Sequence, residues 1–183
     1  RSALAAGGLA SSPFTNTFLA PPAAALAWGL AELFLYGRIS GVGLASGAVA
    51  GMVAITPAAG FVRPVPALVL GALAAMASFA AVRLRPKLGL DDSLDVFAVH
   101  GVAATLGALL TGVFASTAVN SAGADGSIAL VGKQAVGIVA TLVFSGGGSF
   151  GLLKLVSLVT PLRADEQDEW AGMDSAEAGE RGY

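Results

Sequence analysis

The stretch PVPALVLGALAAMASFAAV, residues 64–82, contains no charged side chain and can cross the hydrocarbon core of a bilayer as one helix. Similar runs, ionisable only at His100, occupy residues 2–31, 39–62, 96–124 and 134–153. Each can supply the ~20 residues that a membrane-spanning helix needs. The residues between the runs are charged or turn-forming. The sequence therefore predicts an all-α, polytopic transmembrane helix bundle with about five membrane-spanning helices.

The composition argues against several other classes of protein. Charged residues make up only 12% of the chain and hydrophobic residues 55%, whereas roughly 25% are charged in a typical soluble domain. The runs lack the alternating polarity of barrel strands, and a net charge of −2 offers no basic surface for nucleic acid. With no cysteine, the chain has no thiol chemistry. No pairing of nucleophile and base and no metal-ligand cluster is visible, so we predict no enzymatic activity and no cofactor.

The distribution of cations predicts an orientation. If the chain begins outside, its spans cover residues 13–36, 42–60, 65–82, 94–114 and 134–158. The cytoplasmic side then receives Arg38, Arg83, Arg85, Lys87, Arg163 and Arg181, and the outer side only Arg1, Arg63 and Lys133. This bias predicts a cytoplasmic C-terminus. We divide the chain into a transmembrane domain, residues 1–162, and an acidic cytoplasmic tail, residues 163–183, which is the natural place for regulation.

Glycine spacing predicts how the second span packs and where it ends. Glycines recur every fourth residue at Gly43, Gly47 and Gly51. They share one face of a helix, where a second backbone can approach closely. Thr56-Pro57 follows, and a proline there can kink or stop the helix because it lacks a backbone donor.

His100 is the residue within the spans that points to chemistry. An ionisable group inside a membrane helix is costly and usually faces a cavity or a pathway. Helical spacing surrounds it with an apolar stripe of Val96, Phe97, Ala103, Ala104 and Gly107. Because burial among apolar groups disfavours the imidazolium, we expect a neutral ring that both donates and accepts a hydrogen bond. The alternative is a core histidine bonded to a neighbouring hydroxyl or carbonyl.

Acidic residues precede this span. Asp91, Asp92 and Ser93 are types that cap a helix N-terminus and favour its dipole. Asp95 lies five residues before His100, roughly 140° round an ideal helix, so it is a poor direct partner for the imidazole. We expect Asp95 to cap or brace the helix end.

Three segments together resemble the Amt family of ammonium transporters, part of the Amt/Mep/Rh superfamily. They are GLASGAVAGMVAITPAAG at residues 43–60, DDSLDVFAVHG at residues 91–101 and LGALLTGVF at residues 106–114. The tail is similar to the family's cytoplasmic C-terminus at Leu162-Arg163, Glu169, Gly172, Asp174, Gly179-Glu180 and Tyr183. Because order and spacing agree over nearly the whole chain, the sequence resembles the C-terminal half of such a transporter.

The resemblance implies a fold of two inverted repeats, of which this chain supplies the second, in a homotrimer in the plasma (inner) membrane. It places Ser2 where ammonium is bound in the outer vestibule, His100 at one of two pore histidines and Val96 beside it on the pore wall. We assign Asp95 and Thr56 structural roles near the pore. The implied partners are ammonium or ammonia, the lipid bilayer and a P-II-type regulatory protein at the cytoplasmic face.

The implied function is transport through a histidine-containing hydrophobic pore. An intact ammonium ion in a dry apolar pore faces an idealised desolvation cost of tens of kcal/mol. We therefore expect deprotonation at an outer site and passage of neutral ammonia, with His100 guiding it or relaying the proton. The alternative is an ammonium sensor of the same fold that signals through its tail with little transport. A third reading is a packing scaffold without activity alone, because these spans are expected to form an incomplete pore.

Overall fold

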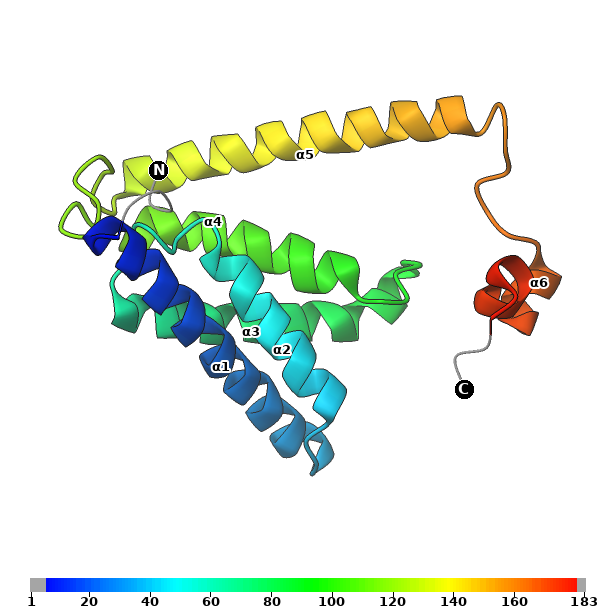
Figure 1. The fold of residues 1–183 in the computed structure, drawn as a ribbon, viewed down its shortest axis with the longest axis horizontal. Helices are drawn as coiled ribbons and strands as arrows, with labels where there is room; N and C mark the ends of the chain where they lie inside the picture. The colour runs from blue at the N-terminus through cyan, green and yellow to red at the C-terminus, as the bar shows by residue number, and fades with distance from the viewer. Residues whose placement is uncertain (1–5, 181–183) are drawn as a thin grey trace. The chain divides into compact units, whose positions relative to one another are not determined.

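The structure, a computed structural model, describes residues 6–180 and contains two compact units, Arg1–Ile138 and Val139–Tyr183. The regular elements of the described residues are all helices (Figure 1). They are α1 (Gly8–Tyr36), α2 (Gly41–Ile55), α3 (Pro64–Leu88), the π-helix η2 (Phe97–Val102), α4 (Ala103–Phe114), α5 (Ile128–Val156), α6 (Glu166–Ala171) and the π-helix η3 (Asp174–Ala178). The predicted all-α class is confirmed.

Among the described residues, four helical segments are long and apolar enough to cross a membrane: α1, α3, Phe97–Phe114 and α5. The second predicted span, residues 42–60, is shorter than expected, because α2 has only 15 residues. Its last residue, Ile55, is followed by turns whose N–H groups at Ala58 and Ala59 both bond the Ile55 carbonyl. Pro57 has no N–H with which to continue the helix. The predicted stop at Thr56-Pro57 is therefore confirmed, and the full length of that span is not.

Three other helices extend beyond their predicted bounds. The α1 helix begins at Gly8 rather than residue 13, and α5 begins at Ile128 rather than residue 134. The α3 helix continues past residue 82 through its cations, because Arg and Lys are good helix formers and interact favourably with the C-terminal dipole. Gly89 closes α3 in a left-handed conformation at φ 64°, which costs glycine little.

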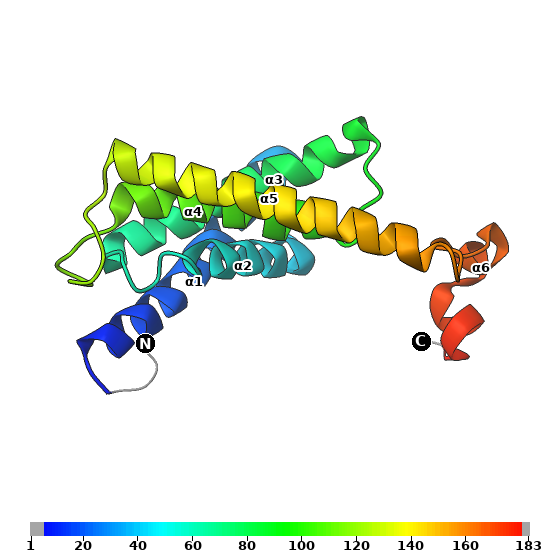
Figure 2. The same ribbon diagram turned by 90° about the horizontal axis from the view of Figure 1, so that it is seen from above.

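In the first unit, α1, α2 and α3 pack against one another, and η2 and α4 pack against α2 and α3 (Figures 1 and 2). The glycine face of α2 lies against α1, as its spacing predicts. A methyl group at Gly47 would lie 2.7 Å from Cβ of Trp28, and one at Gly51 would lie 2.6 Å from Cβ of Ala24. The close approach of the two backbones therefore requires glycine.

A buried carboxylate fixes the turn between α1 and α2. The backbone N–H and the hydroxyl of Ser40 donate to Glu32 at 2.7 and 2.9 Å. The same hydroxyl oxygen accepts the N–H of Gly43 at 2.9 Å and so caps α2. Because Glu32 is only 9% exposed, these bonds compensate for its removal from water.

Asn16, in α1, holds the turns that follow α2. Its side chain is fully buried, and Nδ2 donates to the carbonyls of Ala59 at 2.8 Å and Val62 at 2.7 Å. These bonds supply partners for two carbonyl groups in the turns that follow the short helix. A buried carbonyl group that loses its hydrogen-bond partner still pays the free-energy cost of leaving water. The Asn16 amide therefore stabilises the fold through both carbonyl groups that it contacts.

Replacing Asn16 with leucine should therefore destabilise the protein by about 2 kcal/mol, although leucine has a similar shape. The measurement is the midpoint of thermal unfolding of the purified protein in detergent. Thr17→Leu is the matched control, because the neighbouring Thr17 is exposed and should tolerate the same side chain. Equal midpoints for the two variants would contradict a stabilising role for Asn16.

The second unit, Val139–Tyr183, contains the rest of α5 and the short acidic helices. Arg163 and Glu169 form an exposed ion pair with a 2.9 Å separation between Nε and Oε1. No residue of α5 is buried within the described chain, and Phe144 is 84% exposed.

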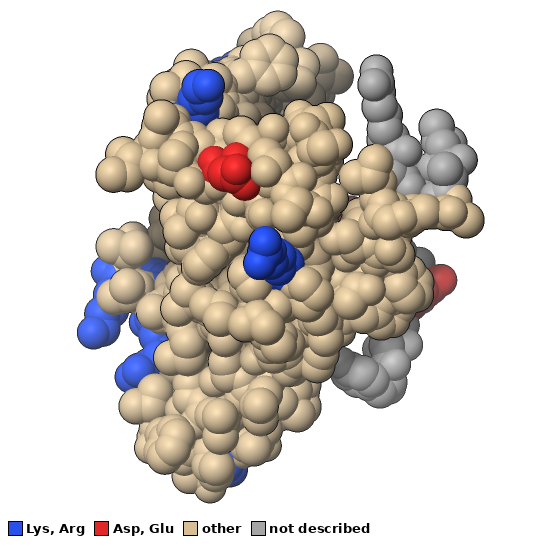
Figure 3. Space-filling view, turned by 90° about the vertical axis from the view of Figure 1, so that its left-hand side faces the viewer, with Lys and Arg blue, Asp and Glu red and all other residues tan. Residues whose placement is uncertain are grey.

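Figure 3 shows one face of the molecule, where uncharged residues cover most of the surface and charged side chains are scattered. Such a surface suits lipid or protein contact rather than water.

Candidate functional site

The candidate site is the exposed face of η2 and of the first turn of α4. Ala98 and Val99 are 2% and 6% exposed and belong to the side of the helix that packs on α2 and α3. Val96 and Phe97 are 51% and 59% exposed, and His100 is exposed as well. The imidazole therefore lies on the open face of the helix, with apolar neighbours.

The predicted apolar stripe around His100 is only partly right. Ala104 is exposed like His100, but Ala103 and Gly107 are buried. A methyl group at Gly107 would lie 2.7 Å from Cα of Ala54, so this side of the helix faces α2. The reason is the π-helix, whose i→i+5 bonds place more residues in a turn than the 3.6 on which the stripe was based. The expected burial of the imidazole is likewise not found within this chain.

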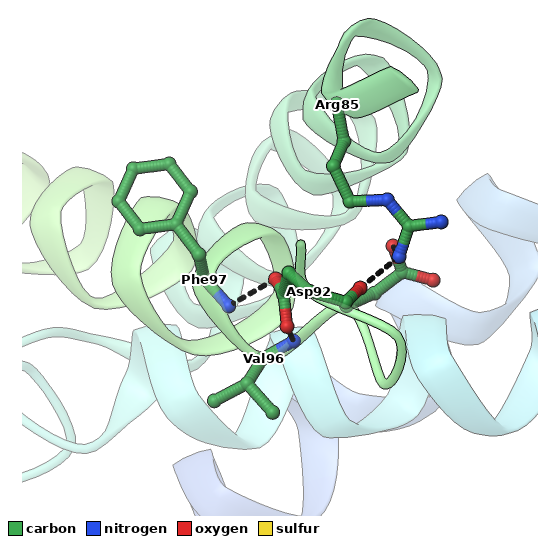
Figure 4. A network of polar contacts seen from close by, with 5 residues as sticks. Arg85, Asp92, Val96 and Phe97 are labelled. Atoms are coloured by element: carbon green, nitrogen blue, oxygen red, sulfur yellow. Dashed lines mark hydrogen bonds and ion pairs between the residues drawn. The ribbon is translucent and has the colours of Figure 1, made fainter. Parts of the chain in front are cut away.

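Asp92 caps the start of η2, as the sequence predicts. Oδ1 accepts the N–H of Val96 and Oδ2 accepts the N–H of Phe97, both at 2.8 Å (Figure 4). A single carboxylate thus serves two backbone donors that have no partner within the helix. The cap fixes the point at which the His100 helix begins.

Arg85, in the last turn of α3, joins this cap (Figure 4). Its Nη1 donates to the backbone carbonyl of Asp92 and lies 2.6 Å from Oδ1 of Asp95. Asp95 has a left-handed backbone with φ 56°, a conformation that is uncommon outside glycine but better tolerated by Asp than by most residues. Asp95 therefore braces the helix end, as predicted, and does so through a cation on another helix.

The remaining predicted residues lie apart from this network. Thr56 is the C-cap of α2, and its hydroxyl donates to the Met52 carbonyl at 2.8 Å. Ser2 lies outside the described residues. Within residues 6–180, no group of three or more His, Asp or Glu side chains is arranged to hold a metal ion. Sequence reasoning missed the role of Arg85, whose only signal was a cation at the end of a helix shortly before an acidic loop.

Comparison with known sequences identifies one family over the whole length of the chain. The profile of the Ammonium Transporter Family matches residues 1–183. An ammonium transporter of Bacillus subtilis (strain 168) is 44% identical over 187 residues, which cover 100% of this chain and 46% of that protein. An ammonium transporter of Aquifex aeolicus (strain VF5) is 41% identical and is covered over 44% of its length. The chain therefore spans less than half the length of these curated relatives.

Solved structures show the same fold. The crystal structure of Saccharomyces cerevisiae Mep2 superposes with a TM-score of 0.79 at 36% identity, over 88% of this chain and 39% of that one. A structure described as a sensor Amt protein superposes with a TM-score of 0.83 at 26% identity, over 94% of this chain and 43% of that one.

Proposed function

Because this chain belongs to the ammonium transporter family, we propose that it lines part of a transmembrane path for ammonium or ammonia. The observation that carries the proposal is the position of His100. It is the single histidine of the chain and lies on an otherwise apolar, exposed face of a segment long enough to cross a membrane. Ionisable residues within membrane-spanning segments usually face a cavity or a pathway. The proposed activity is transport rather than catalysis.

The proposed mechanism follows from the cost of burying a cation. Ammonium binds at the outer side, where Ser2 accepts one of its hydrogen bonds, and then transfers a proton to water on that side. Neutral ammonia passes along the apolar wall formed by Val96 and its neighbours. The His100 imidazole can accept a hydrogen bond at one ring nitrogen and donate one from the other, so it can guide ammonia or relay the proton. Asp95 and Thr56 hold the helix ends near this path.

The complete transporter that we propose is longer than this chain. We assign the chain to the C-terminal half of a transporter with inverted repeats, since the curated relatives are about twice as long. The assembly would be a homotrimer in the plasma (inner) membrane. The cation bias of the connecting segments supports a cytoplasmic C-terminus. Residues 163–183, with the exposed helices α6 and η3, would form the cytoplasmic tail that a P-II-type regulator could contact.

The proposed function is tested by uptake of labelled methylammonium. The full-length gene product is expressed in cells that lack their own ammonium transporters. We expect saturable uptake that unlabelled ammonium competes away, and a changed but not abolished rate when residues 163–183 are deleted. Absence of uptake from cells whose membranes contain the folded protein would overturn the transport proposal.

A second candidate is an ammonium sensor, because a sensor Amt protein is among the similar structures. A sensor would bind ammonium and alter the tail with little flux. Binding measured on purified protein, combined with no uptake into reconstituted vesicles, would favour this function over transport.

A further inference from the structure

The Arg85 side chain connects the end of α3 to the loop that leads into η2. Its Nη1 donates to the backbone carbonyl of Asp92 (Figure 4). The same Nη1 also contacts the carboxylate of Asp95. The side chains of Arg85 and Asp95 are only 25% and 29% exposed. Partial shelter from water makes such a pair stronger than one on an open surface. One guanidinium therefore anchors two aspartates.

Each of these aspartates supplies hydrogen bonds to the first residues of the His100 helix. The Asp92 carboxylate accepts the N–H groups of Val96 and Phe97 at 2.8 Å. The Asp95 carbonyl accepts the N–H of Val99, also at 2.8 Å. Since both aspartates contact Arg85, its guanidinium links the end of α3 to the residues that hold the start of this helix.

The π-helix has a close competitor in the ordinary α-helix. A π segment holds one residue more than an α segment over the same turn, and such segments are rare and often occur at functional sites. The downstream end is fixed, because Gly107 of α4 packs against the backbone of Ala54. Conversion to an α-helix would therefore rotate the upstream end, by up to about 100° at Phe97 and by part of that at His100.

We propose that Arg85 is a positioning residue for transport: through Asp92 and Asp95 it holds Phe97–Val102 in the π form and so directs His100 toward the exposed face. This inference rests on the proposed function for its effect on transport, but the effect on the helix is independent of it. Without the anchor, Ala98 would rotate from the buried side toward the side that Phe97 now occupies. His100 would turn away from its present direction.

The first test compares uptake by variants of the full-length protein. Arg85→Met should lower the maximal rate of methylammonium uptake about tenfold and change KM by no more than about twofold, because the outer binding site is untouched. Arg85→Lys should keep most of the rate, since one ammonium group with three donors can serve both acceptors. Lys87→Met is the matched control, because Lys87 is an exposed cation in the same turn, and it should behave as wild type. A wild-type rate for Arg85→Met would overturn the proposal.

The second test measures the rotation directly. This chain has no cysteine, so Ala98→Cys can be made the only thiol of a full-length protein whose other cysteines have been removed. Ala98 is 2% exposed, and adding Arg85→Met should raise the reaction rate of this thiol with a small methanethiosulfonate about tenfold. A cysteine at Ala104, downstream of the π segment, should react at the same rate in both backgrounds. If Arg85→Met does not accumulate, Asp95→Asn keeps the side-chain shape, removes the charge and should give the same result.

The two tests separate the inference from the function on which it rests. In one outcome, Arg85→Met raises the reactivity of the thiol in Ala98→Cys, but replacing His100 leaves uptake unchanged. This outcome would support the role of Arg85 in the helix and overturn the proposed transport path. In the opposite outcome, Arg85→Met leaves the reactivity of the thiol unchanged, but uptake requires His100. This outcome would overturn the role of Arg85 and leave the proposed transport path intact.

Discussion

Replacing His100 with leucine should abolish methylammonium uptake by the full-length protein while leaving it folded. Leucine fills a similar volume but neither donates nor accepts a hydrogen bond, so the proposed path would lose its polar group. Removal of a group that transfers protons commonly costs 10² to 10⁴ in rate, and we expect a loss of about a hundredfold or more. The measurement is the initial rate of uptake at saturating methylammonium, normalised to the amount of protein in the membrane.

Two controls make the His100 result specific. Because the imidazole is exposed in this chain, His100→Leu should have nearly the thermal midpoint of the wild type. Val113→Leu adds a leucine at another exposed position of the same membrane-long segment and should keep uptake within about twofold. Normal uptake by a folded His100→Leu protein would remove His100 from the path.

Replacing Gly71 with valine should prevent the first unit from folding normally. Gly71 of α3 faces the backbone of α1, where an added methyl group would overlap the Ala20 carbonyl and lie 2.9 Å from its carbon. A backbone cannot move aside as a flexible side chain can, so α1 and α3 would have to separate. Overpacking of this kind usually costs 1–3 kcal/mol, and we expect about 4 kcal/mol or more for this contact between two backbones.

The effect of Gly71→Val is measured as the yield of monodisperse protein and its thermal midpoint. Gly41→Val is the matched control, since a methyl group at Gly41, the first residue of α2, meets no other atom within 4 Å. This control should change stability by about 1 kcal/mol or less. Similar yields and midpoints for the two variants would show that α1 and α3 do not need the close approach.

Hydropathy predicted the helices better than it predicted their ends. An uncharged run marks where a chain can lie in lipid, whereas a helix ends where its backbone bonds end. The α3 helix therefore continues through Arg83 and Lys87 to Leu88, and α5 begins before Lys133. The predicted ends at Tyr36 and Phe114 agree with the structure. The α2 helix stops before its predicted end because Pro57 acts on the backbone itself.

Glycine spacing was informative only where it repeated. The fourfold period in α2 predicted a packing face, and all three of its glycines are buried. Gly71 and Gly107 also meet backbone from neighbouring helices, but neither belongs to a four-residue repeat. A glycine outside a repeat gives no periodic signal. The sequence therefore does not show whether a neighbouring backbone requires the glycine or the helix merely tolerates it.

Part of the candidate site was readable from residue types. The capping role of Asp92 follows from its place before an apolar run, and His100 is conspicuous as the single histidine. The π-helix was not readable, since it depends on how η2 is anchored by a side chain from α3. The error in the predicted stripe has the same origin, because the spacing rule assumed an α-helix. The brace at Asp95 was predicted without its partner, Arg85, which only the tertiary structure identifies.

The bonds between Glu32 and Ser40 have a consequence for biosynthesis. An acidic side chain in an apolar segment opposes insertion from the translocon, by up to about 3 kcal/mol at the centre of a segment that inserts alone. Ser40 follows Glu32 by eight residues, just beyond the end of α1, so the partner of the acid leaves the ribosome soon after it. Release of α1 and α2 into lipid as a preformed hairpin would give the carboxylate its hydrogen bonds before it leaves water.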